Sequence, residues 1–147
     1  MEYNHTQWGY FAVPVFLLVA VVSIPIVFDD ESSTLLTVVV VAFMVGLLAL
    51  VLHFSRLKVT VADGRVVAAF GSGRPHRVIE LKEVTAVSRV RNQWWHGWGL
   101  RKTPEGWMYN VWGLDAVELE LLSGNVFRIG TDEAEKLFAV LSLHVAR

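Results

Sequence analysis

Residues 35–54, LLTVVVVAFMVGLLALVLHF, decide the architecture of this chain. The stretch has twenty residues and no Asp, Glu, Lys or Arg, and an α-helix needs about 20 residues to cross roughly 30 Å of hydrocarbon. Its run of Thr and Val would suit a strand in water. In lipid a segment must satisfy its own backbone hydrogen bonds, so the stretch predicts a membrane-spanning helix.

A second uncharged segment, residues 10–28 (YFAVPVFLLVAVVSIPIVF), precedes it. Pro14 lies in the first turn, where its missing N–H costs little, and Pro25 is predicted to kink or end the helix. The acidic linker 29–34 is short, so residues 10–54 predict a transmembrane helical hairpin after an N-terminal tail, 1–9. Two alternatives are a cleaved signal peptide and core helices of a soluble protein. The lack of Lys or Arg before residue 10 and the segment lengths favour the hairpin.

Charge predicts the orientation of this hairpin. All thirteen Lys and Arg residues occur at or after Arg56, while the linker carries only acidic charges. The positive-inside rule then places Arg56 and Lys58 in the cytoplasm. We therefore expect a multi-pass protein of the cell (plasma or inner) membrane, integral to the lipid bilayer, with both termini cytoplasmic.

Residues 55–147 read as a cytoplasmic domain of short strands and one final helix. Residues 57–61 and 66–70 flank Asp63-Gly64, a hairpin signal, and residues 117–121 (VELEL) alternate strictly, with Glu118 on the expected wet face. Together with further short runs they predict six or seven antiparallel strands. An apolar stripe predicts an amphipathic helix over 132–146. The fold class is therefore an α+β membrane protein.

Four phrases carry a resemblance to a known family: 70–74 (FGSGR), 97–101 (GWGLR), 117–121 (VELEL) and 127–132 (FRIGTD). With the order of elements, they resemble bacterial pleckstrin-homology-like (PH-like) membrane proteins, a family of small and mostly uncharacterised proteins. The resemblance covers nearly the whole chain. It implies a two-helix transmembrane hairpin followed by a PH-like antiparallel β-barrel or sandwich with a C-terminal helix, and it implies no activity.

Five of the six tryptophans fall between Trp94 and Trp112, in a connection punctuated by glycines. Three interpretations are open: the rings plug the barrel core, which we favour, or they dock at the cytoplasmic membrane interface, or they line a ligand or protein pocket. The candidate contact residues for membrane or ligand are Trp94, Trp95, Trp98, Arg101, Lys102 and Trp107.

The chain offers little chemistry for catalysis. It has no cysteine, and its five histidines include no pair spaced as metal ligands. We expect no catalytic residue, metal or cofactor, and no nucleic-acid partner. The resemblance would place phosphoinositide determinants on the first hairpin, but Val67 stands where that pattern needs a basic residue after Arg65, so this binding is not expected.

These observations favour a membrane-tethered interaction or scaffolding module that binds another membrane protein or a second copy of itself. Gly46, with Ala42 and Ala49, would allow close packing of the second helix on the first helix or on another chain. The alternative is a sensor of a lipid or small ligand through residues 94–112. A membrane enzyme ranks third.

Overall fold

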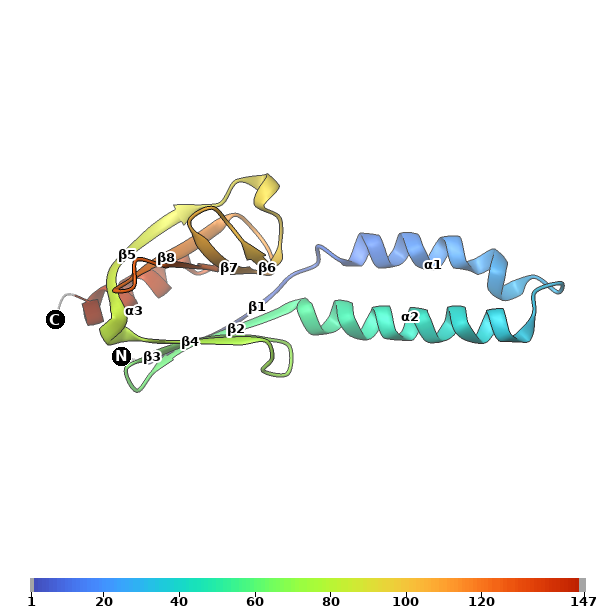
Figure 1. Ribbon diagram of the computed structural model, residues 1–147, viewed down its shortest axis with the longest axis horizontal. Coiled ribbons are helices and arrows are strands. Elements are labelled where there is room, and N and C mark those ends of the chain that lie inside the picture. Colours follow the sequence, from blue (N-terminus) through green and yellow to red (C-terminus); the bar gives the residue numbers. More distant parts are fainter. Residues whose placement is uncertain (1, 146–147) are drawn as a thin grey trace.

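The computed structural model describes residues 2–145 of the chain (Figure 1). A β-rich domain lies at one end, and two long helices project from it side by side. The helices and strands are α1 (Val13–Phe28), α2 (Thr34–Phe54), α3 (Ala134–Val145), β1 (Tyr3–Trp8), β2 (Arg56–Ala62), β3 (Arg65–Phe70), β4 (His76–Glu80), β5 (Val84–Arg91), β6 (Gly99–Lys102), β7 (Gly106–Asn110), β8 (Asp115–Leu121) and β9 (Val126–Gly130), with 3-10 turns η1 (Leu81–Glu83) and η2 (Trp94–His96).

The two long helices lie close to the predicted segments. α2 begins after Ser33, whose hydroxyl accepts a hydrogen bond from the Leu36 N–H. α1 begins three residues later than expected and runs through Pro25 to Phe28, so this proline does not end it. Within residues 2–145, one helix, α2, is both long and apolar enough to cross a membrane, and α1 is a shorter apolar helix.

One face of α2 packs on α1. The less exposed residues of α2 recur every three or four positions, as expected for one face of a helix: Thr37, Val40, Met44, Leu47 and Val51. Gly46 lies elsewhere, because a Cβ built on it meets no atom within 4 Å. Ala42, Gly46 and Ala49 are all exposed, so the small residues of α2 do not pack on α1.

The first sheet has the strand order β1-β2-β3-β4 and is antiparallel throughout. The strand β1 is not predicted by the sequence, which reads as a polar tail. It pairs with β2 from Tyr3↔Val61 to Trp8↔Arg56, so the strands that flank the two long helices are neighbours in one sheet. The predicted tail includes residue 1, which lies outside the described residues.

The second sheet has the order β5-β8-β9-β7-β6. Its strands β6 and β7 come from the tryptophan-rich stretch, which the sequence predicts only as a connection with turns. The prediction of purely antiparallel strands is wrong, because β7 runs parallel to β9 from Gly106↔Val126 to Tyr109↔Ile129. A parallel neighbour becomes possible because the β6–β7 hairpin is carried to the far side of β9.

The two sheets enclose a common core that α3 closes on one side. Leu57 and Phe70 from the first sheet meet Leu119 and Ile129 from the second, and Leu137 lies among the same buried side chains. Burial of one such side chain contributes about 1.5–3 kcal/mol. The predicted α+β fold with a C-terminal helix is therefore confirmed. The helix begins at Ala134, not at 132, and residues 146–147, the end of the predicted helix and domain, lie outside the described residues.

Candidate functional site

The chain crosses the outer face of the second sheet between β5 and β6. These strands are the opposite edges of that sheet, so residues 92–98, which we call the strap, must pass over the strands between them. The centre of the strap is the single turn η2. Gly97 ends that turn at φ +70°, a backbone conformation that favours glycine.

A largely buried ion pair lies beneath the strap. Arg128 Nε on β9 donates to Glu118 Oε2 on β8 over 2.9 Å, and Arg128 Nη1 donates to Asn92 Oδ1 over 3.1 Å. The side chains of Arg128 and Glu118 are only 11% and 15% exposed. Glu118 is therefore not on a solvated face as predicted, because the strap covers that face. A charge-assisted contact of this kind fixes where the strap begins.

An aromatic stack joins the strap to the start of α1. Trp98 stacks on Phe11 with ring centroids 6.1 Å apart, and on Trp112 with centroids 6.0 Å apart. Tyr10 contacts Trp112 edge to face, with ring centroids 6.2 Å apart. The side of the domain from which α1 and α2 leave, which we call the junction end, thus carries a continuous aromatic surface.

The remaining tryptophans of the strap point into solvent. Trp94 is 73% exposed and Trp95 is 62% exposed, and their rings contact each other edge to face. Trp98 is partly exposed, and Trp107 and Trp112 are also exposed. The favoured prediction that these rings plug the core is therefore wrong, because the core between the sheets is filled by aliphatic residues, phenylalanines, Tyr3 and Tyr109.

The junction end is basic. Five chain segments meet there: 8–12, 53–56, 70–76, 92–101 and 110–114; they contain no Asp or Glu. Arg56 lies 5.5 Å from the centre of the Trp8 ring and donates to the Gly71 carbonyl over 2.8 Å. Arg101 Nε donates to the Trp98 carbonyl over 3.2 Å. Rings and cations therefore share one surface, and these five segments contribute no carboxylate to it.

The six residues predicted from the sequence fall into two groups. Trp94, Trp95 and Trp98 lie on the strap, and Arg101 reaches back to it. Lys102 and Trp107 face each other across the far end of the β6–β7 hairpin. The structure thus brings four candidates together at the junction end and places two elsewhere. Arg56 and the aromatic residues before α1 were missed, although their position beside an apolar segment could have indicated them.

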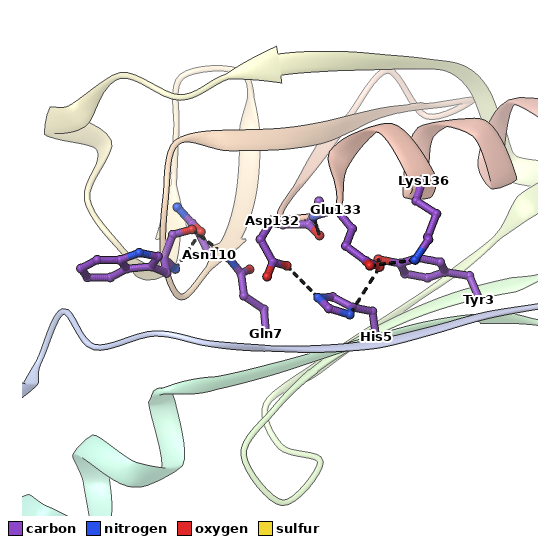
Figure 2. Close-up of polar contacts among 9 residues, drawn as sticks. Tyr3, His5, Gln7, Asn110, Asp132, Glu133 and Lys136 are labelled. Atoms are coloured by element: carbon purple, nitrogen blue, oxygen red, sulfur yellow. Dashed lines mark hydrogen bonds and ion pairs between the residues drawn. The ribbon is translucent and has the colours of Figure 1, made fainter.

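A polar cluster fastens β1 to the start of α3 (Figure 2). His5 and Tyr3 project from β1 toward the loop before α3, where His5 Nε2 meets Asp132 Oδ1 at 2.7 Å. The Tyr3 hydroxyl donates to Glu133 Oε2 over 3.3 Å. Burial raises the pKa of Tyr3 to about 12, and the hydrogen bond from Lys136 lowers the pKa of Glu133. The cluster holds two chain regions together.

Neither region holds a cluster of metal-ligating side chains within residues 2–145. No group of three or more His, Asp or Glu residues there could hold a metal ion. The junction end offers aromatic rings and cations, which suit contact with a lipid interface or an anionic partner. No model of a known protein family and no curated protein matches the chain.

Proposed function

We propose that this chain is a membrane-tethered interaction module whose β domain rests on the cytoplasmic leaflet through its junction end. The observation that carries the proposal is the stack of Tyr10, Trp112, Trp98 and Phe11 at the start of α1. Aromatic rings collect at membrane–water interfaces because one part of the ring is apolar and another is polar. The cations beside them would be attracted to anionic lipid headgroups.

We propose that α1 and α2 both cross the bilayer, with both chain termini in the cytoplasm. The pairing Trp8↔Arg56 supports this, because a chain that leaves and re-enters one sheet must return to the side from which it started. α2 has 21 residues and α1 has 16, which gives lengths of about 31 Å and about 24 Å. The shorter α1 is compatible with modest local thinning of the bilayer.

We also propose that the β domain is PH-like. Two packed sheets followed by a C-terminal helix that closes one side support this assignment. The added strand β1 and the parallel β7–β9 pair depart from the antiparallel barrel that the resemblance implies. Phosphoinositide binding on the first hairpin is not part of the proposal, since Val67 takes the place of a basic residue.

The proposed partner is a transmembrane helix of a second copy or of another membrane protein. α2 presents Ala42, Gly46 and Ala49 away from α1, and small residues allow helix backbones to approach closely in lipid. In vesicles, chains labelled with donor and acceptor dyes should show energy transfer that Gly46→Leu reduces and the neighbouring Val45→Leu retains. The purified chain should form a defined oligomer or co-purify with another membrane protein. A lone monomer would contradict the proposal.

Fluorescence quenching by lipid tests the docking. In vesicles of phospholipids brominated high in the acyl chain, tryptophans at the junction end should be quenched and Trp107 should not. Trp98→Phe should therefore reduce the quenched part of the emission, whereas the matched variant Trp107→Phe should reduce the unquenched part. Equal effects of the two substitutions would show that the domain does not rest on the bilayer through its junction end.

A ligand sensor is the second candidate function. The sequence predicts a single sensing region over residues 94–112, but the strap and the β6–β7 hairpin of this region face different surfaces. The observation that favours a sensor is the hollow beside Trp107, which has a volume of about 270 Å³. Thermal stabilisation by a small ligand would support this function.

A further inference from the structure

The β domain has an open side between β4 and the β6–β7 hairpin. Two hollows lie there, of about 270 Å³ and about 230 Å³, and Arg77, Trp107 and Phe127 line both. The two hollows are adjacent because they share these walls, and we refer to them together as the inter-sheet cleft. It is separate from the aromatic stack at the junction end.

The walls of the inter-sheet cleft are rows of side chains in register. Lys102, Trp107 and Phe127 lie side by side across β6, β7 and β9. Leu100 and Tyr109 form the next row. Tyr109 and Phe127 belong to the core, and their rings lie 5.1 Å apart, so the cleft leads from solvent to an aromatic floor.

Two cations flank this apolar floor without a partner. Arg77 projects from β4 and Lys102 from β6, and no Asp or Glu lines either hollow. Among residues 2–145, neither cation belongs to an ion pair, in contrast to Arg89, Arg128 and Lys136.

The Arg77 charge also acts on the floor of the cleft. Burial raises the pKa of the Tyr109 hydroxyl, and the positive charge of Arg77 partly opposes that rise. The guanidinium is therefore within electrostatic reach of the aromatic floor. A cation so placed, paired with no carboxylate within residues 2–145, leaves room for an external anion.

We propose that the inter-sheet cleft binds a small apolar monocarboxylate, with its carboxylate on Arg77 and its apolar body against Trp107, Tyr109 and Phe127. A guanidinium presents two parallel N–H donors that match a single carboxylate. Lys102 at the mouth adds attraction without requiring a second negative charge. Concave apolar walls with few convergent polar groups are typical of small-molecule sites. This inference does not depend on the membrane docking proposed above.

Octanoate is a suitable probe, and octanamide is its neutral counterpart of nearly the same shape. The full chain would carry 5-fluorotryptophan in lipid nanodiscs, with the Trp107 fluorine resonance assigned by Trp107→Phe. Octanoate should move the Trp107 resonance saturably and leave that of Trp98 in place. Octanamide should bind at least about tenfold more weakly, because a hydrogen bond between charged partners is stronger than one to a neutral amide.

Three variants distinguish the effect of the Arg77 charge on binding from an effect on the fold. Arg77→Gln should weaken octanoate binding at least about tenfold, whereas Lys58→Gln, an exposed cation on the outer face of β2, should leave it unchanged. Leu100→Glu would place a carboxylate beside Arg77 and should abolish binding. Equal binding of octanamide, unchanged binding by Arg77→Gln, or a Trp107 resonance that does not saturate would each overturn the proposal.

Discussion

His5 Nε2 lies 2.7 Å from Asp132 Oδ1, and His5 Nδ1 lies 3.4 Å from Glu133 Oε2, so residues more than a hundred positions apart in the sequence are in contact. This contact ties β1, which enters α1, to the loop that begins α3. Gln7 adds a second tie, since its Nε2 donates to the Trp112 carbonyl over 3.1 Å. The first strand therefore joins the part of the chain that enters α1 to both sheets and to the last helix.

Tyr3→Phe should make the domain less sensitive to alkali. The pKa of Tyr3 is raised from 10.0 to about 12 in the folded chain, so its contribution is fully present below pH 10 and is lost as the pH rises toward 12. The loss amounts to about 2 kcal/mol. The free energy of unfolding can be measured by denaturant titration in detergent micelles, followed by tryptophan fluorescence between pH 9 and 12. It should fall less steeply with pH for Tyr3→Phe than for the wild type. Parallel curves for the two proteins would contradict this assignment.

Glu133→Gln should change how the stability of the fold depends on pH in the acid range. The Lys136 ammonium, and next the His5 ring, hold the pKa of Glu133 below its usual 4.5. The wild-type carboxylate therefore stabilises the fold above the unfolded pKa, and this contribution disappears as the pH falls through the folded pKa. The thermal midpoint of Glu133→Gln should depend less on pH below about 5. Glu31→Gln, in the linker between the helices, is the matched control and should behave as wild type.

Gly9→Ala should disrupt the exit from β1. The Gly9 N–H donates to the Ser55 carbonyl over 2.7 Å, and a Cβ on Gly9 would collide with the Val111 carbonyl. We expect a loss of about 2–3 kcal/mol in the free energy of unfolding. Gly46→Ala is the control, because its Cβ meets open space in a helix, where alanine is favoured over glycine. Equal stability of the two variants would show that the close approach at Gly9 is not needed.

Arg128→Met should release the strap. It leaves Glu118 largely buried without its cation and Asn92 without its donor, and removing one partner of a buried pair costs about 3–5 kcal/mol. The double variant Arg128→Met/Glu118→Met should recover most of that loss. Trypsin provides a local readout, because Arg91 and Arg101 flank the strap and should be cut faster in the single variant. Equal cutting rates would mean that the ion pair does not hold the strap.

Local pattern predicted the parts of the fold whose partners are nearby in sequence. Strict alternation in residues 117–121 and the apolar stripe of the last helix were enough to place β8 and α3. β1 was missed because its inward side chains include His5 and Gln7, whose partners are Asp132 and Trp112. The polar sequence of β1 therefore predicts a tail, because the residues that satisfy its side chains are distant in the sequence.

The sequence predicted several residues of the candidate site, but it did not predict how they are arranged in space. The sequence indicates that the tryptophans matter, but it does not show that β6 lies at the opposite edge of the sheet from β5. That crossing exposes Trp94 and Trp95 on the strap, while the hairpin turns Trp107 toward the inter-sheet cleft. Strand order, which is a property of the whole domain, separates residues that are close neighbours in the chain.

The pairing of β1 with β2 also sets an order of events during synthesis. β1 leaves the ribosome before α1 and α2, but its neighbour in the sheet begins at Arg56, after both long helices. The first strand must therefore wait as an unpaired edge until α1 and α2 have been made, and the sheet then joins their two ends. Completion of the β domain thus requires that the helical pair has already been synthesised, so a chain stalled within α1 or α2 would expose an incomplete sheet to proteolysis.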